Sequence, residues 1–88
     1  MLGQAGQTTI NQANIAQSLF TQPTRVRSAT IYPGSANTGN FLVSYGGAPV
    51  LPALTLPASP GQWYDLAMVQ IQSTVAGDKA AWNLIYKP

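Results

Sequence analysis

The chain has 88 residues, of which 45% are hydrophobic and only 7% are charged, and its formal net charge is +2. Because an average soluble domain has about 25% charged residues, this composition predicts one small folded domain whose surface is polar and nearly neutral. Cysteine, histidine and glutamate are absent, so we expect no disulfide framework and no zinc site. No apolar run reaches the roughly 18 residues of a membrane span, and no basic residue precedes Arg25, so we expect neither a membrane segment nor a secretory signal.

The first third of the chain is crowded with glutamine, asparagine and threonine. Its start, Met1–Gln7, is small, polar and glycine-containing, which makes it the one candidate for flexibility. Segment 11–20 fits two structures: a short helix that Pro23 would end, or an extended segment whose side chains alternate from Ile15 to Leu19. We favour the extended structure.

Beyond residue 24, short β-rich runs recur about every 8 to 12 residues, separated by clusters of Pro, Gly, Asn and Ser. This spacing predicts an all-β fold, a small antiparallel β-sandwich with a jelly-roll-like arrangement of about seven or eight short strands. The predicted strands are 25–32, 40–45, 50–56, 62–66, 69–74 and 80–86.

In the run 40–45, alternation places Phe41, Val43 and Tyr45 on one side of a strand, and we expect that side to face the core. The turn before this strand is predicted to use a positive φ at Gly39. The pair Gly46–Gly47 should end the strand.

Two other runs carry irregularities. In 25–32, Val26 and Ile31 have opposite parity, which predicts either a bulge or burial on both faces. Prolines bracket the run 50–56, and proline cannot donate a hydrogen bond to a neighbouring strand, so this run should be a protected edge strand.

The last two runs alternate regularly. Val69 and Ile71 alternate with glutamines, which predicts a half-buried strand with one wet face. Trp82, Leu84 and Tyr86 alternate with more polar positions, so these large side chains should point inward.

Asp65 and Asp78 are the only acidic side chains. Catalysis by general acids, bases or activated nucleophiles usually needs histidine or a tuned carboxylate, so we expect neither enzyme activity nor a cofactor. We interpret Asp78 as a turn residue in preference to a calcium ligand, which would need several further oxygen donors. Asp65 is interpreted as the cap of a local turn, with a functional anion as the alternative.

Four residues are candidates for partner contacts. Arg25 and Arg27 stand two apart and would point to the same side of a strand, either as a solvated face or as a docking site for an acidic surface. Four basic residues in the whole chain are too few for the usual phosphate contacts, so nucleic-acid binding is not expected. Of the adjacent Trp63 and Tyr64, one should be exposed as a flat contact for a sugar or a protein.

The order of these segments resembles small β-sandwich proteins of tailed-bacteriophage virions, of the capsid decoration (cement) or head-fibre type. The resemblance covers residues 25–86 and rests on "RVRSATIYPGSANTGNFLVSYGG" followed by "LTLPASPGQWYDLAMVQIQSTVAGDKAAWNLIYKP". These are turn and strand signatures in a shared order, and they assign no ligand-binding residue. The segment "SYGGAPVLPA" departs from the pattern in its closely spaced turn formers.

The resemblance implies a structural virion protein, made in the host cytoplasm, that binds the outside of the major capsid protein shell and stabilises it. It implies a homo-oligomer, with a trimer favoured. Residues 1–20 would form a polar arm that docks on the shell or is exchanged with a neighbouring subunit, and residues 21–88 would form the sandwich. The alternatives are a head-fibre or tail-spike domain that recognises host surface glycan and a non-viral adhesion or matrix module.

Overall fold

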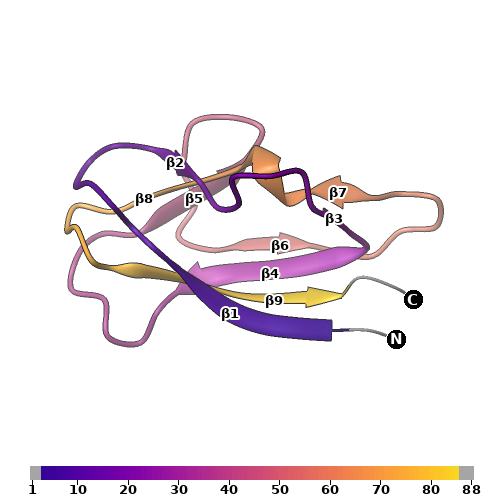
Figure 1. Ribbon diagram of the computed structural model, residues 1–88, viewed down its shortest axis with the longest axis horizontal. Coiled ribbons are helices and arrows are strands. Elements are labelled where there is room, and N and C mark those ends of the chain that lie inside the picture. Colours follow the sequence, from indigo (N-terminus) through magenta and orange to yellow (C-terminus); the bar gives the residue numbers. More distant parts are fainter. Residues whose placement is uncertain (1–2, 86–88) are drawn as a thin grey trace.

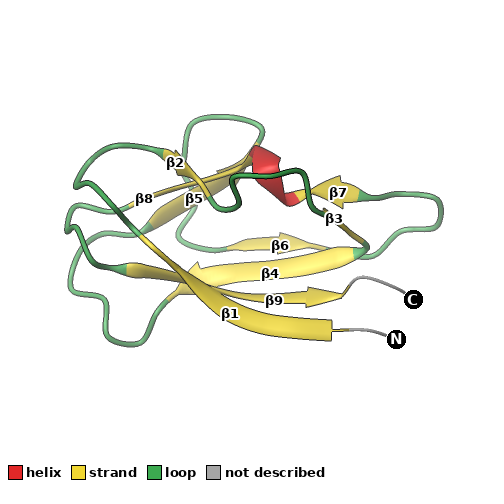
Figure 2. Cartoon of the chain, in the orientation of Figure 1, coloured by secondary structure: helices red, strands yellow, loops and turns green. Residues whose placement is uncertain are grey.

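The computed structural model describes residues 3–85 and shows an antiparallel β-sandwich, as the strand spacing predicts. Two sheets lie one above the other in Figure 1, and Figure 2 shows that one 3₁₀ turn interrupts an otherwise β and loop structure. The elements in chain order are β1 (Gly3–Thr9), β2 (Gln17–Ser18), β3 (Arg25–Val26), β4 (Ser28–Pro33), β5 (Leu42–Tyr45), β6 (Leu54–Leu56), β7 (Tyr64–Asp65), η1 (Leu66–Met68), β8 (Val69–Gln72) and β9 (Lys79–Ile85).

The strands form two sheets and a short ribbon. The four-stranded sheet has the order β1-β9-β4-β6, and the three-stranded sheet has the order β2-β8-β5. Strands β3 and β7 pair with each other as a two-stranded ribbon at one end of the sandwich (Figure 1). Every pairing is antiparallel. A jelly-roll connection of these strands stays a prediction.

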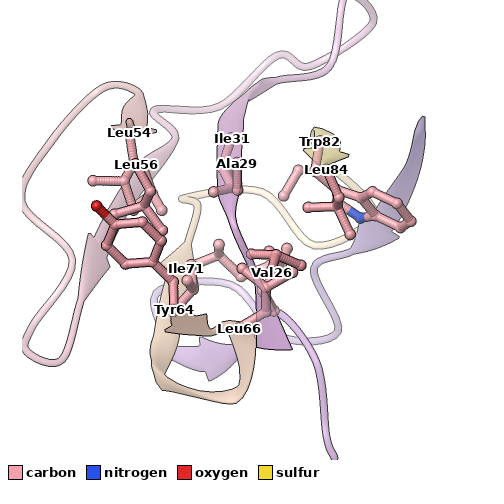
Figure 3. Packing of buried hydrophobic residues seen from close by; sticks show 14 of the residues in the cluster. Val26, Ala29, Ile31, Leu54, Leu56, Tyr64, Leu66, Ile71, Trp82 and Leu84 are labelled. Carbon is pink, nitrogen blue, oxygen red and sulfur yellow. The ribbon is translucent and has the colours of Figure 1, made fainter. Parts of the chain in front are cut away.

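Apolar side chains from both sheets fill the space between them, as Figure 3 shows. Alternation along β8 buries Val69 and Ile71 and leaves Gln70 and Gln72 on the outer face, as predicted. The largest side chains that are almost fully buried are Ile10, Ile31, Leu66, Ile71 and Leu84.

The predicted irregularity in the run 25–32 is a change of partner strand. Val26 belongs to β3 in the ribbon, whereas Ile31 belongs to β4 in the four-stranded sheet. Both side chains are fully buried despite their opposite parity, because the chain leaves one pairing and enters the other at Arg27. Val26 and Ile31 can both be buried because they belong to two strands with different pairing partners.

The N-terminal segment is more regular than its composition predicts. Residues from Gly3 onward form β1, which pairs with β9 along its whole length, so the expected flexibility of Met1–Gln7 is wrong for the described part. Ile10 and Leu19 are buried in the core, and segment 11–20 contains no helix. Residues 3–20 thus lie against the sandwich, and exchange of residues 1–20 between subunits stays a prediction.

Two expectations for segment 37–47 are wrong. Phe41 and Val43 are buried, but Tyr45, the last residue of β5, is 36% exposed, and its ring meets that of Tyr64 edge-on. Gly39 does not adopt a positive φ. Glycine is needed at position 39 because a Cβ atom there would collide with the side chains of Ser73, Thr74 and Asp78. The positive φ occurs instead at Gly46, directly after β5 ends.

Two predicted strands are shorter than expected: the run 50–56 is a strand only at Leu54–Leu56, and the run 62–66 only at Tyr64–Asp65. The predicted edge position of β6 and the inward direction of the large side chains of β9 are confirmed. β6 is an edge of the four-stranded sheet and lies within the proline-bracketed run. On β9, Trp82 and Leu84 point inward and Asn83 is exposed. Tyr86 and Lys87 lie outside the described residues.

Candidate binding surface

The β3–β7 ribbon brings the four predicted contact residues to one end of the sandwich. Arg25 pairs in register with Asp65, and Val26 pairs with Tyr64. The guanidinium carbon of Arg27 lies 5.3 Å from the centre of the Trp63 ring, within the range of a cation–π interaction. The Nε atom of Arg27 is buried and has no hydrogen-bond partner among residues 3–85.

The two neighbouring aromatic residues have different roles. Tyr64 is buried, its hydroxyl donates a 2.8 Å hydrogen bond to the carbonyl of Pro57, and its ring contacts Tyr45 at 5.8 Å. Trp63 is 44% exposed. One member of the pair is therefore available for contact, as predicted, and it is Trp63.

Asp65 caps the turn that follows β7. Its Oδ1 accepts hydrogen bonds of 3.0 Å from the backbone N–H of Thr24 and from that of Ala67, the second residue of η1. The carboxylate thus links the segment before β3 to η1, two segments that are distant in sequence. The predicted capping role is confirmed.

A second feature, which the sequence did not reveal, is a groove of about 590 Å³ on the outer face of the three-stranded sheet. Its floor includes the outward glutamines of β8, and its rim includes Met68, which is 49% exposed. Val50 and Leu51, next in the chain after the rim residue Pro49, are 68% and 43% exposed. The groove is lined by Ala16, Gly46, Gly47, Ala48, Pro49, Ala67, Met68, Gln70 and Gln72, none of which carries a charge.

The groove was missed for a physical reason. Its walls come from the loop after β5, from η1 and from the segment before β2, and only the folded chain places them together. The one signal in the sequence is the alternation of glutamines along β8, which predicted a solvent-facing side of the strand but no groove on it.

Asp78 lies at the end of the sandwich opposite the β3–β7 ribbon, and its carboxylate connects the loop before β5 to Ser73. Its carboxylate accepts hydrogen bonds from the Ser73 hydroxyl at 2.7 Å, the Gly39 N–H at 2.8 Å and the Thr38 N–H at 3.2 Å. The Ser73 hydrogen bond, aided by the two backbone donors, lowers the pKa of Asp78 although burial acts in the opposite direction. This arrangement stabilises the turn and agrees with the structural role predicted for Asp78.

Within the described part of the chain, no three side chains of His, Cys, Asp or Glu lie together as metal ligands, and no helix is long and apolar enough to cross a membrane. Comparisons with protein-family models, with curated proteins and with solved structures gave no significant match. The fold and surface define the chain as a small all-β sandwich.

Proposed function

We propose that this chain is a structural virion protein that binds the outer surface of a capsid shell and stabilises it. The observation that supports this proposal is the uncharged groove, which includes the exposed Met68 and whose lining residue Pro49 is followed in the chain by the exposed Val50 and Leu51. Contiguous exposed apolar surface is a common mark of protein–protein contact. The sequence resemblance to decoration proteins supplies the identity of the partner.

The groove suits a neutral, extended partner segment. Apolar contact would come from Met68, Val50 and Leu51, while the glutamine amides of β8 can donate and accept hydrogen bonds on the floor. A shell displays its subunits in many copies, so weak binding of each decoration subunit is sufficient when subunits are linked as oligomers. Stabilisation would follow because bound subunits bury surface that the shell alone leaves exposed.

The test is a comparison of virions with and without the gene for this chain. Particles lacking the protein should lose their genome at a lower temperature, and added purified protein should restore the wild-type temperature. Met68→Lys and Val50→Lys should bind shells at least tenfold more weakly, since each places an unpaired ammonium group in an apolar contact. Val75→Lys is the matched control, because Val75 is also exposed but lies in the β8–β9 turn.

Deletion of residues 1–20 is not a clean test of shell binding. It removes β1 and the buried side chains of Ile10 and Leu19, so it would disturb the fold itself. The point substitutions at Met68, in the groove, and at Val50, next to its lining residue Pro49 in the chain, avoid this problem, since both side chains are exposed. Equal shell binding by Met68→Lys, Val50→Lys and wild type would overturn the assignment of the groove.

A second candidate function is recognition of host surface glycan, and the exposed Trp63 favours it. Sugars pack on exposed aromatic rings, and the nearby Arg27 guanidinium could donate hydrogen bonds to hydroxyl groups. Under this function, Trp63→Ala virions would keep their thermal stability but adsorb poorly to cells. Under the cement function, adsorption would be normal.

A further inference from the structure

Strand β1 is a long edge strand with one open side. It pairs with β9 on one side, and no strand within residues 3–85 pairs with the other (Figure 1). An edge strand exposes backbone N–H and C=O groups that another strand can bind. Seven residues without proline or charge make β1 an unusually accessible edge.

The other sheet edges are short or blocked. β6 has three residues and is followed by Pro57, and β2 has two residues. The free side of β5 is already occupied, since Val43 and Leu51 exchange backbone hydrogen bonds of 2.8 and 3.0 Å. The contrast singles out β1 as the edge that can accept a further strand.

The hydrogen bonds at the end of β1 show which of its backbone groups are open. The N–H of Ile10 donates to the carbonyl of Asp78, and the carbonyl of Ile10 accepts from Gly77, so Ile10 faces the β9 side. Because the direction alternates along a regular antiparallel strand, residues of even number face β9. The N–H and C=O groups of Gly3, Ala5 and Gln7 therefore point to the open side.

The side chain of Gln17 already closes one end of this open side. Its Nε2 donates to the carbonyl of Thr9 at 3.0 Å, and its Oε1 accepts from the N–H of Asn11 at 2.8 Å. One side-chain amide thus substitutes for a peptide group of a neighbouring strand. Beyond Thr9 the edge is capped, and the open part ends near Gln7.

We propose that β1 pairs antiparallel with β1 of a second copy of this chain about a two-fold axis at Ala5. This register places Gly3 opposite Gln7 and Ala5 opposite itself, so the open backbone groups of all three residues find partners. It also leaves the Gln17 cap intact in both copies, whereas registers centred nearer Thr9 would compete with it. The strand carries no charge, so two identical copies do not repel each other.

The pairing joins the two four-stranded sheets into one continuous sheet with the order β6-β4-β9-β1-β1-β9-β4-β6. The exposed side chains of β1 stay on the solvent face, because this register pairs odd-numbered residues of one copy with odd-numbered residues of the other. A two-fold contact predicts a dimer or an assembly of dimers, in contrast to the trimer that the family resemblance implies. The inference does not depend on binding to a capsid.

Single cysteines test the register cleanly because the chain has none of its own. Ala5→Cys should form a disulfide-linked dimer under mild oxidation, since paired residues in such a ladder have Cα atoms about 5.5 Å apart. In this register the two Gln7→Cys residues of a dimer would be displaced from each other by four residues, about 13 Å along the strand, and should not form a disulfide. Thr55→Cys is the matched control, exposed on the opposite edge of the same sheet.

Sedimentation equilibrium of the wild type should give a concentration-dependent mass that approaches twice the 9.3 kDa of one chain. Ala5→Lys should weaken the dimer at least tenfold by placing two ammonium groups across the axis, and Thr55→Lys should leave it unchanged. A monomeric wild type up to millimolar concentration would overturn the proposal. So would cross-linking of Gln7→Cys or Thr55→Cys as efficient as that of Ala5→Cys.

Discussion

The Oδ2 atom of Asp78 accepts a 2.8 Å hydrogen bond from the backbone N–H of Gly39, a residue 39 positions earlier in the chain. The loop before β5 is therefore hydrogen-bonded to a carboxylate that lies just before β9. Asn37 adds two further bonds to the backbone of Lys79, both of 2.8 Å. Together these contacts join the two sheets at the end of the sandwich opposite the β3–β7 ribbon.

Gly39→Ala should lower the free energy of unfolding by about 2 kcal/mol, because overpacking at a tight position costs about 1–3 kcal/mol. A Cβ at this position would lie 2.7 Å from the hydroxyl oxygens of Ser73 and Thr74 and 2.8 Å from the Asp78 carboxylate. Thermal denaturation measures the change. Gly47→Ala is the control, since a Cβ there has no neighbour within 4 Å, and equal effects of the two substitutions would contradict the close-approach explanation.

The Asp78 contacts also predict a pH dependence of stability. The pKa of Asp78 is lowered in the folded state from its ordinary value of 3.8, so the charged carboxylate stabilises the fold above that pH. This contribution is lost as the pH falls through the lowered pKa. Asp78→Asn should therefore melt at a lower temperature than wild type at pH 7, and the difference should shrink below pH 3.8.

A matched variant separates this effect from a general loss of structure. The Ser73 hydroxyl is the largest cause of the lowered pKa, so Ser73→Ala should raise the pKa of Asp78. Titration of the carboxyl group by NMR measures this shift directly. A melting difference between wild type and Asp78→Asn that stays constant from pH 7 to acid would contradict the linkage.

Local patterns were sufficient to predict most strands. The alternation of Val69 and Ile71 with glutamines predicted β8, and the prolines around β6 predicted an edge strand. The opposite parity of Val26 and Ile31 predicted a bulge or burial on both faces, and the structure resolves it as two strands with different partners. These signals act within a few residues, which is the range over which side-chain alternation can be read. The fold class follows from their spacing.

Long-range pairings explain what the sequence did not reveal. Gly39 was expected to serve a turn, but its partner Asp78 is 39 residues away and no local pattern connects them. Likewise, nothing in segment 11–20 indicates that the Gln17 amide caps the edge of β1. The groove over β8 depends on three separated segments, so it appears only once the sheets are assembled.

Trp63 and Tyr64 should differ strongly in their effect on stability. Tyr64→Ala removes a buried ring and should cost about 3–5 kcal/mol. Tyr64→Phe loses the hydrogen bond to Pro57 and should cost about 1 kcal/mol. Trp63→Ala loses its contact with Arg27 and should cost no more than about 1 kcal/mol. Urea denaturation gives all three values, and a large loss in Trp63→Ala would show that its ring is structural.

Gly6 and Trp82 are predicted to be energetically coupled. They pair directly between β1 and β9, and a Cβ on Gly6 would lie 2.5 Å from two carbons of the indole ring. Two further contacts hold the indole ring in place. The ring of Phe20 packs against it with 5.2 Å between ring centres, and the indole Nε1 donates a 3.1 Å hydrogen bond to the Thr8 hydroxyl. It therefore cannot move aside freely.

Gly6→Ala should accordingly destabilise the wild type by about 1–3 kcal/mol, the usual cost of overpacking. The same substitution in a Trp82→Leu background should cost less than half as much, because the atoms that it meets are absent. Urea denaturation of the four proteins in this double-mutant cycle gives the coupling energy. Additive effects would mean that β1 does not lie under the indole ring, and the close packing of β1 against β9 would then have to be revised.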